Sequence, residues 1–328
     1  MARAWHLMSR PQGLPTDENF ALKDVDLPEV ADGLVRVRNR WLSVDPYMRG
    51  RMNDVKSYVP PFQLGQPMEG GAIGEVVESK AEGLAPGDLV LHMGGWRDEA
   101  VTPARAVQKL PNLGAEPQLF LGVLGVTGAT AWFGLFDAAK ARPGDIVFVS
   151  AAAGAVGSVV VQLAKAKGMT VIGSAGGPEK CEFVRSLGAD HVIDYKAGSI
   201  LKGLAAAAPD GIDVYFDNVG GDHLDAAMAV ARDFARFAIC GMIEGYNKAE
   251  APSFRFAARI IAARIRLQGF IVSDYFPRMQ EFYAEMGPLV ANGTVRAQET
   301  VVDGLEAMPD AFRGLFSGAN TGKMLVRL

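Results

Sequence analysis

The fold of this chain is decided by the stretch Val147-Phe148-Val149-Ser150-Ala151-Ala152-Ala153-Gly154-Ala155-Val156-Gly157. The stretch begins with apolar residues typical of a buried strand and ends in small residues that open a helix. In such a turn Gly154 lets the backbone approach a pyrophosphate, and Gly157 permits close packing of the helix. The first N–H groups of the helix attract negative charge. The stretch therefore predicts a dinucleotide-binding turn.

The glycine pair alone leaves a second interpretation open. Ala152 stands where the first glycine of such a turn is usual, so the pair also fits an ordinary strand-to-helix turn. The residues that follow favour the cofactor site, because strands and helices alternate along them. Strands are predicted at residues 146–150, 170–173 and 191–193, with helices after Gly154 and from Pro178.

The alternation continues for three more strands. We predict strands at residues 212–216, 236–240 and 267–272, a helix from Asp222 and a long helix within residues 254–265. Six strands alternating with helices indicate an α/β domain with a doubly wound parallel sheet.

The segment before residue 115 has a different hydrophobic periodicity. Short apolar runs such as residues 33–38 and 74–78 alternate with period two, which is typical of antiparallel strands. Pro-Gly-Asp occurs at residues 86–88 and 143–145, each time as a turn before a strand. At the end of the chain a helix over residues 305–317 precedes a strand over 323–328. A lone strand needs a sheet to join, so we expect it to return to this β-rich part.

Composition excludes several classes of protein. The 328 residues are 49% hydrophobic and 21% charged, too apolar for a mainly disordered chain. A formal net charge of −4 offers no basic field for nucleic acid. The two cysteines, Cys181 and Cys240, are too few for a disulfide framework, which favours a reducing compartment.

Neither membrane insertion nor export is expected. The first ten residues lack the unbroken apolar stretch of a signal peptide. Two runs, residues 117–136 and 146–164, contain no charged side chain. Glycines interrupt the first run, and the second changes from strand to helix periodicity, so neither is typical of a membrane span. We predict that both runs form buried core and that the protein is cytoplasmic.

The end of the second predicted strand indicates which dinucleotide is bound. An NAD site usually has an Asp or Glu there, but residues 171–177 end in small neutral side chains. A 2′-phosphate would fit that space, and Lys180 and Tyr195 could bind it through an ammonium and a hydroxyl group. Lys180 in isolation also fits a solvated lysine on a helix surface. The missing acid together with the available base favours NADPH over NADH.

Several motifs in order carry a family resemblance. The turn, Gln162-Leu163-Ala164-Lys165 and Gly188-Ala189-Asp190 resemble the zinc-independent medium-chain dehydrogenase/reductase superfamily. The resemblance narrows to the prostaglandin reductase and alkenal/one double-bond reductase branch and spans nearly the whole chain. It is carried by residues 44–49, 124–131, 217–221 and 240–243, by Tyr246-Asn247, and by residues 320–323. Trp132 and Val126-Thr127 depart from the Tyr and Met-Pro common in that branch.

The resemblance implies two domains with the active site in the cleft between them. Residues 1–119 and 297–328 would form a GroES-like substrate domain, and residues 120–296 a Rossmann domain for NADPH. Tyr47 would line the substrate pocket, and Tyr246 would lie near substrate and nicotinamide. The implied cofactor-binding residues are Thr130, Ala153, Gly154, Ala155, Val156, Gly157, Gly176, Lys180, Tyr195, Asn218, Cys240, Gly241, Tyr246, Phe270, Val272, Asn320 and Gly322.

No metal site is expected. A catalytic zinc site of the wider superfamily needs Cys, His and acidic ligands and a structural one needs four clustered thiolates, but Ser43 and Asp45 occupy the early strand-end region here. The four histidines, His6, His92, His191 and His223, are scattered without ligand spacing and fit structural or surface roles. Cys240 ends an apolar strand and fits a buried small hydrophobe rather than a nucleophile.

Without a metal the substrate must already be polarised, as an α,β-unsaturated ketone or aldehyde is. Hydride would add at the β-carbon, and the resulting enolate oxygen needs hydrogen-bond donors. Tyr246 could donate to it or help to protonate the α-carbon, or it could only pack against the nicotinamide. Two other hypotheses stay open, an NADPH quinone oxidoreductase and a cofactor-binding protein with little catalysis. The family resemblance also implies a homodimer that extends the parallel sheet.

Overall fold

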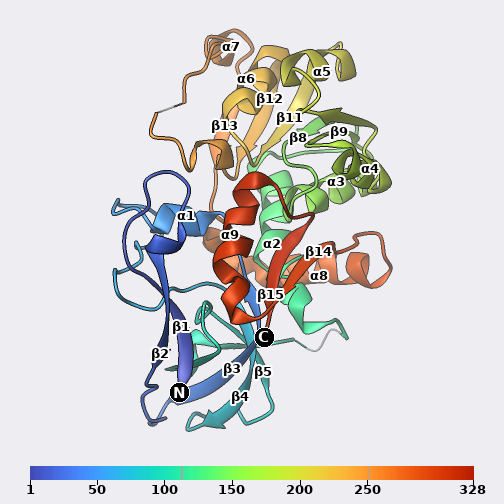
Figure 1. Cartoon of the computed structure of the whole chain (residues 1–328). Helices are drawn as coiled ribbons and strands as arrows, with labels where there is room; N and C mark the ends of the chain where they lie inside the picture. The colour runs from blue at the N-terminus through green and yellow to red at the C-terminus, as the bar shows by residue number, and fades with distance from the viewer. Residues whose placement is uncertain (112–113, 251) are drawn as a thin grey trace. The chain divides into compact units, whose positions relative to one another are not determined.

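The computed structural model describes residues 1–111, 114–250 and 252–328 and divides into two compact units. The β-rich unit comprises Met1–Leu121 and Glu299–Leu328, and the parallel-sheet unit comprises Gly122–Gln298. Both ends of the chain therefore belong to the β-rich unit (Figure 1).

The parallel-sheet unit confirms the predicted doubly wound fold. Its six strands lie in the order β10-β9-β8-β11-β12-β13, and every neighbouring pair is parallel. The strands are β8 (Ile146–Val149), β9 (Thr170–Ala175), β10 (His191–Asp194), β11 (Ile212–Asp217), β12 (Ala231–Ile239) and β13 (Arg266–Gly269). The helices are α2 (Val126–Phe133), α3 (Gly157–Ala166), α4 (Pro178–Ser186), α5 (Ile200–Ala207), α6 (Gly221–Val230), α7 (Arg259–Ala262) and α8 (Met279–Ala291). The uncharged run 146–164 becomes β8 followed by α3, as predicted.

The strand register lines up large side chains on one face of this sheet. Ile172, Phe148, Tyr215 and Phe237 are neighbours across β9, β8, β11 and β12, and α5 and α6 cover them. On the opposite face Gly173 lies against Val184 of α4. The inner strands β8, β9 and β11 are thus covered on both sides, which explains why they are largely continuous apolar runs instead of alternating ones.

Two predictions about the end of this unit are wrong. The long helix expected within residues 254–265 is the four-residue α7, and β13 ends at Gly269 instead of Val272. At the start of α7 the N–H groups of Arg259, Ile260 and Ile261 donate to carbonyls three residues earlier, so this part of the segment forms 3₁₀-type turns instead of α-helix. After α7 Arg264 has a φ of 49°, a left-handed conformation that ends the helix. Val272 begins the 3₁₀ segment Val272–Arg278. Helices α5 and α8 were not predicted.

In the β-rich unit the strands before residue 115 pair antiparallel, as predicted, whereas β14 and β15 pair in parallel. The larger sheet has the order β14-β15-β3-β4-β5-β7, with β6 beside β3. The C-terminal β15 pairs with β3, which confirms that it returns to this unit; Figure 1 shows the red strand there. The strands are β1 (Ala2–Leu7), β2 (Phe20–Val25), β3 (Leu34–Ser43), β4 (Ala72–Ser79), β5 (Leu89–His92), β6 (Glu99–Pro103), β7 (Gln108–Lys109), β14 (Glu299–Asp303) and β15 (Lys323–Arg327). The helices are α1 (Tyr47–Arg51) and α9 (Met308–Ser317). Gly87 and Gly144 of the two Pro-Gly-Asp turns have positive φ, as such turns require.

Candidate functional site

The turn between β8 and α3 is held together by close backbone contacts. The Gly154 N–H donates to the Ala151 carbonyl at 2.9 Å. A Cβ at Gly157 would lie 2.3 Å from that carbonyl oxygen, a distance that real Cβ atoms do not reach. At Gly154 the same contact would be 3.2 Å, which is tight but not prohibitive. A side chain at position 157 would therefore collide with the backbone of the turn, so this position requires glycine. Residues Ala153, Gly154, Ala155 and Val156 form the part of the turn directly before α3.

The loop after β11 is organised by the buried carboxylate of Asp217. Its Oδ1 accepts from the Tyr215 hydroxyl at 2.6 Å and from the N–H groups of Val219 and Gly220 at 2.9 and 2.8 Å. Burial raises the pKa of Asp217, and these hydrogen bonds act against that shift. The carboxylate thereby fixes the backbone that leads into α6.

Asn218 of this loop lies beside the β8–α3 turn. Its side-chain N–H donates to the Ser150 carbonyl at 2.8 Å, and its backbone N–H donates to the Ser150 hydroxyl at 2.9 Å. Two predicted site segments, the turn at 153–157 and Asn218, are thus joined through Ser150. Parallel strands bring their carboxyl ends to one edge of the sheet, which is where such sites form.

A second cluster lies at the carboxyl ends of β9 and β10. A Cβ at Gly176 would meet the Tyr195 hydroxyl at 2.7 Å and Cε of Lys196 at 2.9 Å. The Asp194 carboxylate accepts from the N–H groups of Gly177 and Lys196, both at 2.9 Å. The loops after β9 and β10 are therefore joined by hydrogen bonds to Asp194. A residue larger than glycine at position 176 would collide with the Tyr195 hydroxyl.

Two lysines bring positive charge to this cluster, beside the Asp194 carboxylate that accepts from its backbone N–H groups. Burial, and then the charge of Lys196, lower the pKa of the half-buried Lys180 ammonium. Two like charges that lie close together repel each other, and a bound anion would reduce that repulsion. Lys196 was not predicted as a site residue. Its position directly after Tyr195 is the signal that could have identified it.

Tyr246 folds back onto the loop that follows β12. The Met242 N–H donates to its phenol oxygen at 3.3 Å, and a Cβ at Gly241 would be 3.2 Å from that oxygen. The N–H groups of Cys240 and Gly241 donate to the Asp217 carbonyl at 3.0 and 3.1 Å. The structure thus brings Cys240, Gly241 and Tyr246 next to the Asn218 loop. Burial, followed by the charge of Asp217, raises the pKa of the Cys240 thiol to about 12, so this group is a neutral thiol at neutral pH.

Three further predicted residues of this unit lie on α2 and after β13. The Thr130 hydroxyl donates to the Val126 carbonyl at 2.7 Å within α2. Phe270 lies against Phe216 with ring centroids 6.2 Å apart, and a Cβ at Gly134 would be 2.5 Å from its ring. Val272 is half-buried at the start of the segment after β13.

Tyr47, Asn320 and Gly322 belong to the β-rich unit. Burial, and then the nearby Asp45 charge, raise the pKa of the Tyr47 phenol well above its usual value, so Tyr47 is a neutral hydroxyl. The Asn320 side chain donates to the Gly322 carbonyl at 2.8 Å, and Gly322 has a φ of 69°.

The segment that carries Tyr47 is tied to β15 by a buried lysine. The Lys323 ammonium donates to the Val44 carbonyl and to Asp45 Oδ1, both at 2.9 Å, and to the Met324 carbonyl at 3.2 Å. All three protons of the ammonium group have acceptors, so the buried charge is compensated. Lys323 thus fixes the entry into α1.

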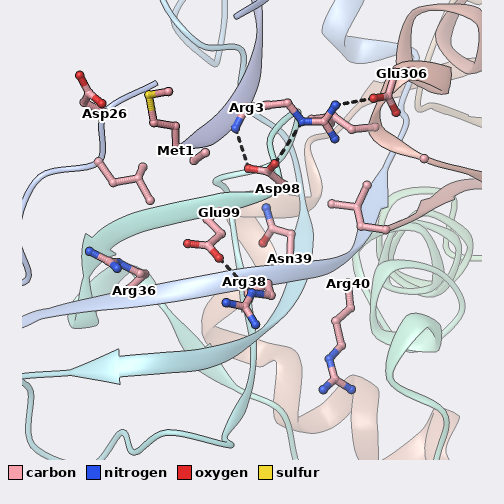
Figure 2. Close-up of a pocket in the computed structure, with 15 residues that line it drawn as sticks. Met1, Arg3, Asp26, Arg36, Arg38, Asn39, Arg40, Asp98, Glu99 and Glu306 are labelled. Atoms are coloured by element: carbon pink, nitrogen blue, oxygen red, sulfur yellow. Dashed lines mark hydrogen bonds and ion pairs between the residues drawn. The ribbon is translucent and has the colours of Figure 1, made fainter. Parts of the chain in front are cut away.

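A cavity of about 840 Å³ in the β-rich unit contains none of the predicted site residues. Figure 2 shows Arg3 between Asp98 and Glu306, and Arg38 paired with Glu99. Its charged walls are largely paired with each other, which distinguishes this cavity from the cluster around Gly176 with its two lysines.

Within residues 1–111, 114–250 and 252–328, no group of three or more His, Cys, Asp or Glu side chains is placed to hold a metal ion. In the same ranges no helix has both the length and the apolar character that crossing a membrane requires.

Comparison with known proteins identifies the family. Residues 3–110 match the model described as the N-terminal domain of oxidoreductase, and residues 155–292 match the model described as zinc-binding dehydrogenase. The chain is 42% identical to the NADPH-dependent curcumin reductase of Escherichia coli, over 99% of this chain and 96% of the relative. It is 39% identical to the 2-alkenal reductase (NADP(+)-dependent) of Nicotiana tabacum, over 96% of this chain and 94% of the relative.

A solved structure agrees with these relatives. The crystal structure of CurA from Vibrio vulnificus in complex with NADPH superimposes with a TM-score of 0.94 at 43% identity, covering 99% of this chain and 98% of that one. The fold and the relatives define an oxidoreductase with Rossmann and GroES-like domains. The chain belongs to the zinc-independent branch of the medium-chain dehydrogenase/reductase family, together with prostaglandin and alkenal reductases.

Proposed function

We propose that the protein reduces the carbon–carbon double bond of α,β-unsaturated ketones and aldehydes with NADPH, by hydride transfer to the β-carbon and without zinc. The observation that carries this proposal is the similarity over nearly the whole chain to an NADPH-dependent curcumin reductase and to a 2-alkenal reductase. A 2-alkenal is by definition an α,β-unsaturated aldehyde, so the substrate class follows from that relationship.

The cluster around Gly176 fits the 2′-phosphate of NADPH. Lys180 and Lys196 supply positive charge, and the Tyr195 hydroxyl lies where a Cβ at position 176 would collide with it. The end of β9 presents Ser174, Ala175 and Gly176, so no carboxylate of that strand would repel the phosphate. The residues present therefore suit NADPH better than NADH.

The remaining cofactor contacts are assigned by their positions along the carboxyl edge of the sheet and by the family resemblance. The β8–α3 turn would hold the pyrophosphate with its backbone N–H groups. We assign the rest of the cofactor to Thr130, Asn218, Cys240, Gly241, Tyr246, Phe270, Val272, Asn320 and Gly322.

When bound, the cofactor supplies the hydride, and the protein must then stabilise the enolate oxygen of the substrate. We assign this to the Tyr246 hydroxyl. The Met242 N–H donates to its oxygen, and accepting one hydrogen bond strengthens a hydroxyl as a donor of another. Tyr47, a neutral phenol in the β-rich unit, would line the substrate pocket as a further donor.

The function is tested by following NADPH oxidation with three acceptors, a 2-alkenal, an aliphatic enone and a simple quinone. We expect turnover with the alkenal or the enone, with the saturated carbonyl compound as the product. A quinone preferred over both would favour the quinone oxidoreductase hypothesis. Tight NADPH binding without turnover of any acceptor would favour a cofactor-binding protein.

The role of Tyr246 is tested by Tyr246→Phe, which keeps the ring and removes the hydroxyl. We expect turnover of an enone to fall by roughly 10- to 100-fold, at the low end of general-acid effects. The affinity for NADPH should stay close to that of the parent protein. Unchanged turnover would show that Tyr246 only packs against the nicotinamide.

The phosphate site is tested by Lys180→Ala and Lys196→Ala, with Lys202→Ala, an exposed lysine on α5, as the control of equal charge change. Each of the first two should weaken NADPH binding by about tenfold, the effect of losing one partly desolvated charge contact. NADH binding should not change in any variant. An equal loss for NADH would contradict the assignment.

We also propose a cytoplasmic homodimer. The edge strand β13 has no neighbour on one side within the described sheet, and Leu267 on it and Ile261 on α7 are exposed. An uncovered edge with apolar side chains is a surface for strand pairing between two copies. Light scattering of the protein and of Leu267→Lys would test the dimer.

The proposed cytoplasmic location agrees with the cysteines. The free thiols of Cys181 and Cys240 suit a reducing compartment.

A further inference from the structure

His223 lies on α6 in the parallel-sheet unit and has no role in the proposed reaction. Only 6% of its surface is exposed, and neither ring nitrogen has a hydrogen-bond partner in the described part of the chain. A neutral imidazole carries one donor and one acceptor, and leaving both unmade in the interior is unfavourable. The position of this ring therefore needs an explanation other than hydrogen bonding.

The contacts of His223 are aromatic. Its ring is parallel to that of Phe148, with an interplanar angle of 6° and centroids 6.4 Å apart. The ring of Tyr195 meets it edge to face, at 77° and 5.4 Å. Edge-to-face pairs at this distance are attractive and fix the relative orientation of the two rings. His223 thus lies between the core of the sheet and the tyrosine of the Gly176 cluster.

The ring beneath His223 is itself held rigidly. Phe148 stacks on Tyr215, with centroids 5.0 Å apart and an interplanar angle of 14°. The Tyr215 hydroxyl donates to Asp217, the carboxylate that organises the loop after β11. A continuous row of rings therefore leads from this loop through Phe148 and His223 to Tyr195.

Tyr195 needs such support because it is 40% exposed. Its backbone is held by the hydrogen bond from its N–H to the Ala175 carbonyl at 3.2 Å, but this bond does not determine where the ring points. The contact with His223 restricts the ring, and the Tyr195 hydroxyl then lies over Gly176.

We propose that His223 is a positioning residue that holds the Tyr195 ring so that its hydroxyl meets the 2′-phosphate of NADPH, and that it thereby contributes to the preference for NADPH over NADH. This inference rests on the proposed function, which assigns Tyr195 to that phosphate. It requires the flat ring of His223 and not its nitrogens. The neutral state of the ring at physiological pH agrees, since burial lowers the pKa of His223 to about 4.

The experiment measures the dissociation constants of the full chain for NADPH and NADH by calorimetry. His223→Ala and His223→Leu remove the flat ring, and leucine fills the space if alanine prevents folding. Both should weaken NADPH binding by about three- to tenfold, the range of one aromatic pair, with NADH binding unchanged. His223→Phe keeps the ring and should retain the NADPH preference of the parent protein.

Two results would overturn the inference. One is an unchanged NADPH preference in a folded His223→Ala or His223→Leu variant. The other is a loss in His223→Phe as large as in those two, which would mean that a ring nitrogen is needed. Tyr195→Phe separates this failure from that of the proposed function. If Tyr195→Phe lowers the NADPH preference and the His223 variants do not, only the inference about His223 fails. If Tyr195→Phe has no effect, the assignment of Tyr195 to the phosphate fails as well.

Discussion

The β-rich unit buries His6 and His92 and the parallel-sheet unit buries His223, and the rings of His92 and His223 are accommodated in opposite ways. In the β-rich unit the Gly94 N–H donates to Nδ1 of His92 at 3.2 Å, so the proton must be on Nε2, which donates to Asn39 Oδ1 at 2.8 Å. In the parallel-sheet unit His223 is held by ring contacts, without a hydrogen-bond partner in the described residues. A polar side chain can thus be part of a hydrogen-bond network or can simply replace an apolar ring.

The same contrast applies to the segments that carry the proposed site. In the parallel-sheet unit the β8–α3 turn depends on the backbone, because Gly157 leaves no room for a side chain. In the β-rich unit the segment before α1 depends on a side chain, because the Lys323 ammonium bonds to Val44 and Asp45. Substitutions in its side-chain hydrogen-bond networks should therefore lower the stability of the β-rich unit.

The largest effect is expected for Lys323→Met, which breaks a buried ion pair and leaves the Asp45 carboxylate without its cationic partner. We expect the free energy of unfolding to fall by about 3 kcal/mol, as for other buried pairs that lose one member. Denaturation by urea would measure it. The double variant Lys323→Met/Asp45→Asn removes the remaining charge and should recover part of the loss.

An exposed ion pair provides the control. On α4 a guanidinium nitrogen of Arg185 lies 3.0 Å from a carboxylate oxygen of Glu182, and the two side chains are 54% and 75% exposed. Arg185→Met should change the free energy of unfolding by less than about 0.5 kcal/mol. A similar loss in both variants would mean that the burial of Lys323 does not matter.

A smaller effect for each residue is expected from pH. Burial lowers the pKa of both His92 and His223 to about 4 in the folded state, whereas the unfolded chain has the usual value of about 6.5. Above pH 6.5 neither state holds the proton, so the two histidines do not affect stability there. As the pH falls from about 6.5 to about 4, the unfolded chain takes up protons that the folded protein excludes, and stability is lost.

At pH 5 this loss should be about 2 kcal/mol for each histidine relative to pH 7.5. Urea denaturation of the parent protein and of His223→Phe at the two pH values would measure it. The variant should lose about 2 kcal/mol less than the parent protein, since one of the two groups no longer titrates. Equal losses would show that His223 is protonated as easily in the folded protein as in the unfolded chain.

The smallest effect distinguishes the two rings at constant pH. His92→Phe leaves the Asn39 amide oxygen and the Gly94 N–H without a partner and should cost about 1–2 kcal/mol at pH 7.5. His223→Phe loses no hydrogen bond and should be neutral or slightly stabilising. Thermal unfolding of the two variants would compare them. A greater loss in His223→Phe would reverse the contrast between the units.

Much of the parallel-sheet unit was predictable because its strands are buried on both faces. Runs such as Ile146–Val149 and Ile212–Asp217 consist mainly of apolar residues, and that signal is strong. The helix predicted within residues 254–265 is wrong, because turns with three-residue hydrogen bonds replace most of it, and apolar periodicity does not distinguish such turns from an α-helix. Lys196 directly follows the predicted Tyr195, but its proximity to Gly176 comes from the pairing of β10 with β9.

Four features follow directly from the order of the amino acids: the alternation of strands and helices, the glycine turn, the absence of an acid at the end of β9 and, through the motifs, the family. These are local features, set by side-chain size, periodicity and backbone freedom over a few residues. The folded arrangement was needed to show that His223 packs against Tyr195, that Asp217 organises the Asn218 loop and that Lys323 holds the Val44–Asp45 segment. Each of these depends on distances between residues brought together by strand pairing and burial, and such distances have no counterpart in the spacing along the chain.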